Sequence, residues 1–160
     1  MNLELVEIEK PEDVNLVLGQ AHFVKTVDDL YQALALSAST LRFGIAFCEA
    51  SGPRLVRVGG NDHDLARIAE RNLHAIGAGH AFLVLLRNGF PVNVLNAVKQ
   101  LPEVCHVFCA TANDVQVVVA ATDQGRGILG VVDGLPPLGV ETDEDVEARR
   151  ALLSALGYTP

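Results

Sequence analysis

One histidine and one lysine stand close together where the sequence predicts that a strand gives way to a helix. Residues 14–18 form an apolar run typical of a buried strand, and a helix is expected to begin near Thr26. A helix N-terminus offers free backbone N–H groups and a partial positive charge, which suit an anion. His22 could take up a phosphoryl group or act as a base, because histidine titrates near neutrality. Lys25 could contact a phosphate as a point charge.

These two residues also have simpler interpretations. His22 could hydrogen-bond its own loop and organise the turn, and Lys25 could be a solvated surface lysine. His80 begins a predicted strand, which argues against a role in the same site unless that strand runs opposite to its neighbours. His63 and His74 are expected on the solvent face of a helix, so neither is a candidate.

A second candidate segment spans residues 122–127 and reads Thr-Asp-Gln-Gly-Arg-Gly. Gly125 and Gly127 allow close approach of the backbone, and a loop of this kind can form an anion-binding nest. Arg126 between them could contact a phosphate with two parallel hydrogen bonds. The alternative is a hairpin turn with an exposed arginine. The segment does not have the spacing of a P-loop or of a dinucleotide-binding fingerprint.

Three further polar residues could complete such a site. Glu49 and Asp123 each follow a predicted strand, where a carboxylate could orient a ribose hydroxyl or hold Mg²⁺ through water. Asn61 could contribute to the same site, although it is also a good N-cap for the helix that follows. Carboxylates at strand ends more often cap loops. The five histidines do not stand at metal-ligand spacing, so no metal centre is predicted.

The composition predicts a single α/β domain over residues 1–160 with extensive burial. Hydrophobic residues make up 49% of the chain and the mean hydropathy is +0.28. A compact monomer has limited room for so much apolar surface, so we expect other subunits to cover part of it. The net charge of −8 argues against binding to a nucleic-acid backbone, while still allowing one small phosphate pocket.

The sequence also favours a protein that works in the cytoplasm, away from membranes. No apolar run approaches the roughly 20 residues that span a bilayer, and the first ten residues lack a signal-peptide core. The three cysteines lie within apolar runs, which is typical of small buried side chains in a reducing compartment.

The pattern of apolar residues predicts a mixed sheet with helices packed on it, in an α/β/α-like layering. Residues 42–49 alternate large and small apolar side chains, which indicates a central strand covered on both faces, with something packed very closely on the small face. Residues 3–8 are predicted to form an edge strand. Residues 104–110 and 115–121 are predicted to form a β-hairpin. Thr26 and Asp29 are close to a capping box for the first helix.

Long blocks of this chain resemble the adenosine-specific kinase family, a group of small archaeal and bacterial proteins. The resemblance extends from about Val14 to Tyr158 and is carried by the segments 19–26, 43–52, 60–62, 91–97, 108–113 and 122–127. Blocks of this length are far more specific than a short motif.

The resemblance implies a mixed α/β fold, a trimer-based homo-oligomer, and binding of adenosine or AMP. It also implies a phosphorylated histidine, which we assign to His22, with His80 as the second choice. On this hypothesis Lys25 and Arg126, with the amides of Gly125 and Gly127, offset charge during phosphoryl transfer. The alternative hypothesis is an oligomeric sensor of adenosine or AMP that carries out no turnover.

Overall fold

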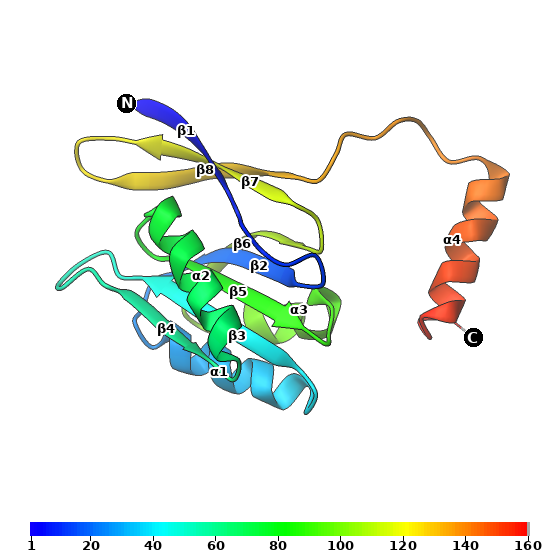
Figure 1. Ribbon diagram of the computed structural model, residues 1–160, viewed down its shortest axis with the longest axis horizontal. Coiled ribbons are helices and arrows are strands. Elements are labelled where there is room, and N and C mark those ends of the chain that lie inside the picture. The colour runs from blue at the N-terminus through cyan, green and yellow to red at the C-terminus, as the bar shows by residue number, and fades with distance from the viewer. Residues whose placement is uncertain (160) are drawn as a thin grey trace.

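The computed structural model describes residues 1–159 and leaves Pro160, the last residue of the predicted domain, outside the described part. Twelve elements follow one another along the chain (Figure 1): β1 (Asn2–Glu7), β2 (Asn15–Ala21), α1 (Thr26–Ser37), β3 (Arg42–Cys48), β4 (Val56–Gly60), α2 (His63–Ile76), β5 (Ala81–Arg87), α3 (Pro91–Lys99), β6 (Val104–Thr111), β7 (Val115–Ala121), β8 (Arg126–Asp133) and α4 (Asp143–Ala155). The mixed α/β class predicted from the sequence is confirmed.

The strands form two sheets, and every pair of neighbouring strands is antiparallel. A five-stranded sheet has the order β4-β3-β5-β2-β6, and a three-stranded sheet has the order β1-β7-β8. The predicted edge position of the first strand is confirmed. The predicted hairpin of residues 104–110 and 115–121 is wrong, because β6 joins the five-stranded sheet and β7 joins the other. Thr111 and Asn113, at the crossing between the sheets, both hydrogen-bond the Asp133 carboxylate at the end of β8.

The five-stranded sheet is covered on both faces. Helices α1 and α3 lie on one face, and α2 and the three-stranded sheet share the other, so the two sheets and α2 enclose one core (Figure 1). β2 and β5 are buried almost throughout. Strands covered on both faces read as continuous apolar runs, which explains the high hydrophobic content of the chain.

Strand β3 behaves as its alternating side chains predict. Phe43, Ile45 and Phe47 join the core beneath α1 and α3, whereas Ala46 and Cys48 join the core beneath α2. Gly44 lies directly under the α2 backbone, where an added Cβ would collide with Leu65 and Ala66. The glycine therefore sets how closely α2 approaches the sheet.

Two helix N-caps differ from the predicted ones by a single residue each. The N-cap of α2 is Asp62, whose side chain accepts hydrogen bonds from Asp64 N and Leu65 N. Asn61, the predicted cap, instead accepts from Phe43 N and donates to Leu41 O. The predicted capping box of α1 is absent from this described helix, because Thr26 donates to the Phe23 carbonyl and the N-cap is Lys25.

The carboxyl ends of β2 and β3 lie at the same edge of the sheet, with the amino end of β5 between them. Ala21 N donates to His80 O (2.9 Å), and His80 N donates to Cys48 O (2.8 Å). The segment that begins β5 therefore runs opposite to both neighbours, and this orientation places His80 at the same edge as the ends of β2 and β3. His22, Glu49 and His80 consequently stand along one edge.

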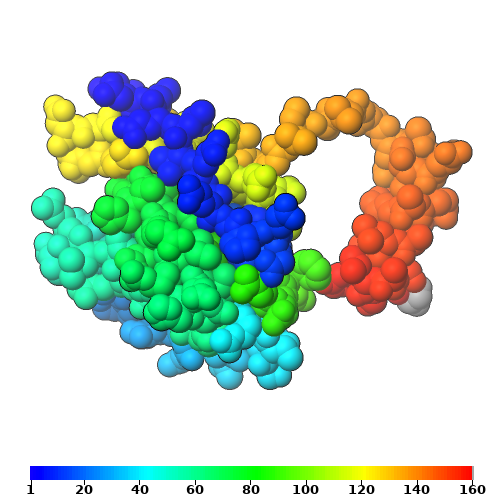
Figure 2. Space-filling model, in the orientation of Figure 1, coloured from blue at the N-terminus to red at the C-terminus, as the bar shows by residue number. Residues whose placement is uncertain are grey.

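The chain leaves the sheets after β8 and ends in an isolated helix. Residues 134–142 run outward from the body, and α4 stands beside it (Figure 2). Thr142 is the N-cap of α4 and accepts a hydrogen bond from Asp145 N. Across residues 1–159, the helices are too short or too polar to cross a bilayer.

Candidate functional site

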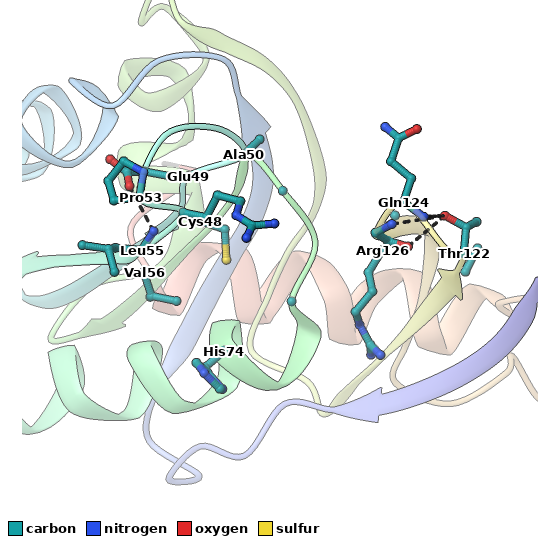
Figure 3. A pocket seen from close by; sticks show the side chains of 16 residues that line it. Cys48, Glu49, Ala50, Pro53, Leu55, Val56, His74, Thr122, Gln124 and Arg126 are labelled. Carbon is teal, nitrogen blue, oxygen red and sulfur yellow. Dashed lines mark hydrogen bonds between the residues drawn. The ribbon is translucent and has the colours of Figure 1, made fainter.

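A cleft of about 790 Å³ opens between the loop after β3 and the turn that joins β7 to β8. Figure 3 shows the two walls: Glu49, Ala50, Pro53 and Leu55 on one side, and Thr122, Gln124 and Arg126 on the other. The C-terminal end of α2 forms the floor with His74 and Gly77. The volume lies within the range of small-molecule sites, roughly 300–1,000 Å³.

Glu49 holds the first wall in place. Its carboxylate accepts hydrogen bonds from Leu55 N (3.0 Å) and from Arg57 Nε and Nη2 (2.9 and 2.7 Å). The backbone hydrogen bond from Leu55, followed by the Arg57 guanidinium, lowers the pKa of Glu49 below its usual value. Both carboxylate oxygens are thus engaged by protein donors, so this arrangement does not fit Mg²⁺ coordination.

The second wall is a turn closed by its own threonine. Thr122 Oγ1 accepts from Gln124 N (3.3 Å) and Gly125 N (3.2 Å), and Thr122 N donates to Gly125 O (2.8 Å). The Gly125 amide is therefore used within the turn rather than directed at an anion. Gly127 lies in β8 opposite Ala120. A Cβ added to either glycine would meet open space. The two glycines therefore present bare backbone to the cleft.

Arg126 is held by three partners at the floor of the cleft. Its Nη1 lies 2.8 Å from Glu4 Oε2, its Nε donates to Ile76 O (2.8 Å), and its Nη2 donates to Ala75 O (3.5 Å). A guanidinium at the last carbonyls of α2 also complements the helix dipole. Arg126 therefore joins α2, β1 and β8, and three of the five N–H donors of its guanidinium are already engaged.

Two cleft residues were not among the sequence-based candidates. Arg54 lines the first wall with left-handed backbone (φ 53°), and its side chain makes no ion pair or hydrogen bond with the described part of the chain. The sequence feature that could have identified Arg54 is its position in the loop that follows a buried strand. His74 is exposed, as its position on the helix predicts, but it lies on the last turn of α2 beneath the cleft.

A smaller recess of about 220 Å³ adjoins the cleft and shares Gly79, Arg126 and Gly127 with it. Gln20 of β2 and Phe108 of β6 line this recess between the two sheets. It offers an aromatic ring and a side-chain amide, the groups that suit a flat heterocycle with donors and acceptors on its edge.

His22 and Lys25 lie at the start of α1 and do not line the cleft. The His22 side chain is exposed and stacks against Phe23, with ring centroids 6.5 Å apart. Lys25 Nζ forms an ion pair with Asp29 (3.2 Å). Strands β2 and β3 are separated only by β5, so the backbone ends that carry His22 and Glu49 are roughly 10 Å apart at a strand spacing of about 4.8 Å.

A buried carboxyl lies beside this corner. Glu103 is only 5% exposed, its backbone carbonyl accepts from His22 N (3.0 Å), and its Oε1 has no hydrogen-bond partner within residues 1–159. Burial raises the pKa of Glu103, and the nearby Asp29 carboxyl raises it further. Burial therefore makes the folded chain hold this proton to a higher pH than the unfolded chain does.

The remaining candidates fall elsewhere. The His80 ring stacks on Phe47 at 6.0 Å between centroids, and its backbone is left-handed (φ 65°). Asn61 lies near the start of β3, at the opposite edge of the sheet, where it hydrogen-bonds the backbone of Leu41 and Phe43. Asp123 belongs to the β7–β8 turn but does not line the cleft. Within residues 1–159, no three acidic, histidine or cysteine side chains are placed to share a metal ion.

Comparison with known proteins identifies relatives of the whole chain. The model of a family described as adenosine specific kinase matches residues 6–159. The crystal structure of the PH1918 protein from Pyrococcus horikoshii OT3 is 44% identical in sequence and superposes with a TM-score of 0.95, covering 99% of this chain and 98% of that one. A search of curated proteins gives no match.

The buried Glu103 leads to a prediction about pH. As pH rises above about 4.5, the unfolded chain releases this proton before the folded chain does, so the wild type loses stability until pH passes the raised folded-state pKa. Glu103→Gln removes that loss. We expect its Tm to match the wild type near pH 4 and to exceed it at pH 8 by roughly 2–4 °C, the effect of about 1 kcal/mol in a domain of this size.

Thermal unfolding from pH 4 to 8 checks this, with the exposed Glu12→Gln as the control that leaves the profile unchanged. A constant loss of Tm at every pH for Glu103→Gln would contradict the argument, because it would mean that the ionised carboxylate makes a favourable contact.

Proposed function

The chain belongs to the adenosine-specific kinase family, and from this premise we propose that it binds adenosine or AMP and transfers a phosphoryl group through a histidine. The observation that carries the proposal is the cleft between the loop after β3 and the β7–β8 turn. It has the volume of a small-molecule site, and two of the sequence blocks that carry the family resemblance form its walls.

In this proposal the nucleoside lies across the cleft, with its adenine in the adjoining recess. Phe108 would contact the face of the base, and the Gln20 amide can both donate to and accept from its edge, as glutamine does with adenine. The bare backbone at Gly125 and Gly127 leaves room for the ribose. Glu49, fixed by Arg57 and Leu55, would shape the wall on the other side of the sugar.

Arg54 is the cation we assign to the phosphate of AMP. It lines the cleft, and its guanidinium is not engaged by another described side chain. Arg126, by contrast, is committed to Glu4 and to the end of α2, so we propose that it positions the floor of the site.

The phosphoryl step is assigned to His22. A phosphate ester or anhydride donor would lose its P–O bond as a P–N bond forms to the imidazole. The ribose hydroxyl oxygen would then attack phosphorus, the P–N bond would break, and the hydroxyl proton would pass to the released imidazole. Lys25 and the first amides of α1 would offset charge on the moving group. His80, on the same sheet edge, is the second choice.

One observation favours the alternative of a sensor without turnover. All five histidines are described, and His74 is the one that lines the cleft. If phosphorylated His22 does not exchange its phosphate with a nucleoside in the cleft, the phosphate would instead be a regulatory mark beside an adenosine or AMP site.

Replacing Arg54 should separate phosphate recognition from nucleoside recognition. Arg54→Ala is expected to weaken AMP binding at least tenfold, about 1.4 kcal/mol, and to leave adenosine affinity within about twofold, because only AMP presents a phosphate. Isothermal titration calorimetry with both ligands measures the two effects. Arg67→Ala, on the exposed side of α2, is the matched control. An equal loss for both ligands would remove Arg54 from the phosphate contact.

Exchange of the two candidate histidines for asparagine should identify the phosphosite. Asparagine tolerates the left-handed backbone of His80, so both variants keep a suitable residue. We expect His22→Asn to abolish ³²P incorporation and His80→Asn to retain it. The reverse pattern would transfer the role to His80. A labelled wild type that binds adenosine but forms no AMP supports the sensor, and an unlabelled one rules out the phosphohistidine.

A further inference from the structure

The C-terminal arm, residues 134–158, makes almost no contact with the rest of its own chain. Leu135, Leu138 and Val140 are 93%, 105% and 93% exposed. Across 143–155, a fully described helix, no side chain is buried. Apolar side chains so completely exposed are unusual in a folded protein and indicate a missing contact surface.

Helix α4 has an apolar side that faces no other element. Val146, Leu152, Leu153 and Leu156 fall on one side of the helix by their spacing, and Leu152 and Leu156 are 58% and 50% exposed. An isolated helix shorter than about 12–15 residues is marginal in water, and most helical stability in proteins comes from packing an apolar side. The arm therefore requires a partner to hold its structure.

A second unpartnered surface lies on the three-stranded sheet. Its inner side carries Val117 and Val119, which are fully buried against the core. Its outer side carries Leu3 and Leu5 of β1, opposite Ala120 and Val118, together with Leu129 and Val132 of β8. These four leucine and valine side chains are 47–66% exposed. We call this surface the outer sheet face.

The surface area of the chain matches this description. The accessible surface is 9564 Å², whereas a compact monomer of 17.1 kDa is expected to expose about 7,750 Å². The excess is roughly 1,800 Å², and a stable interface buries about 800 Å² on each partner. The chain thus exposes more surplus surface than one standard interface would cover.

The arm also keeps its place in a solved relative. Residues 134–158 make up about 16% of the chain, so a superposition of the body alone could not exceed a TM-score of about 0.84. The observed 0.95 with the PH1918 protein, over 99% of this chain, requires that most of the arm superposes as well. A tail without a partner would not be expected to hold the same outward position in a crystal.

We propose that the arm of one copy packs its apolar side on the outer sheet face of a second copy of this chain. The arm leaves the end of β8 and runs away from its own three-stranded sheet (Figure 1), so it does not cover its own outer sheet face. A second copy presents an uncovered outer sheet face to this arm, and the arm of the second copy can cover an outer sheet face in the same way. The proposal is independent of the nucleotide site, because the arm and the four exposed leucine and valine side chains of the outer sheet face do not line the cleft.

Point variants of the full chain test both surfaces. The arm variant is Leu152→Glu with Leu156→Glu, and the face variant is Leu3→Glu with Leu5→Glu. All four side chains are exposed in the single chain, so its fold should survive, as circular dichroism would verify. The control is Leu36→Glu, which is 87% exposed on α1 and belongs to neither surface.

Light scattering during size-exclusion chromatography gives the mass of each species. We expect the wild type and the control to have a multiple of 17.1 kDa, and each variant to associate at least tenfold more weakly and to approach a single chain. A monomeric wild type would overturn the proposal, leaving the surfaces to a different partner or to the chain itself. Variants with the wild-type mass would overturn it too.

Mixing the two variants tests which surfaces meet. The arm variant keeps an intact face and the face variant keeps an intact arm, so an equimolar mixture can form one good contact between unlike copies. A mass above that of either variant alone supports the pairing of arm with face. No increase in mass would contradict it, because arms would then pair with arms and faces with faces.

Discussion

The Arg126 guanidinium holds together the part of the molecule on which the candidate site depends. It binds the carbonyl of Ile76 at the end of α2 and the carboxylate of Glu4 in β1, while its own backbone begins β8. Charge-assisted hydrogen bonds of this kind are stronger than neutral ones. They fix the distance between α2 and the three-stranded sheet, which together cover one face of the five-stranded sheet. The cleft is the space between α2 and the three-stranded sheet where these two elements separate.

The cleft and the corner formed by His22 and Lys25 lie at the same edge of the five-stranded sheet, but on different faces of it. On the face shared by α2 and the three-stranded sheet, Glu49 and the β7–β8 turn form the walls of the cleft. At the start of α1, His22 and Lys25 form an exposed corner beside the buried Glu103. Phosphoryl transfer requires the phosphate carried by His22 to reach a nucleoside in the cleft across this edge, whereas a sensor has no such requirement. The choice between transferase and sensor rests on this difference.

Local patterns in the sequence predicted the parts of the fold that local physics determines. The alternation in β3 and the close packing at Gly44 both follow from neighbouring residues. The sequence did not predict that β6 and β7 belong to different sheets. Alternation of apolar residues indicates that one face of a strand is buried, but it does not indicate which strand it pairs with. Asn61 and Asp62 are equally good caps by type, and only the contact with Phe43 decides between them.

The site was partly predictable for the same reason. Glu49 and the turn at residues 122–127 were identified as one site, and both line the cleft. The partners of Arg126 lie far away in sequence, so its commitment to α2 and β1 was invisible to local reasoning. His74 and Arg54 enter the cleft only because α2 ends, and the loop after β3 turns, beside the second sheet.

A crystal structure of the protein with AMP tests the central claim most directly. The account predicts the nucleoside in the cleft, with the adenine against Phe108 and Gln20, the ribose beside Gly125, and the phosphate within reach of Arg54. AMP bound away from the cleft, with the cleft left to solvent, would contradict the account.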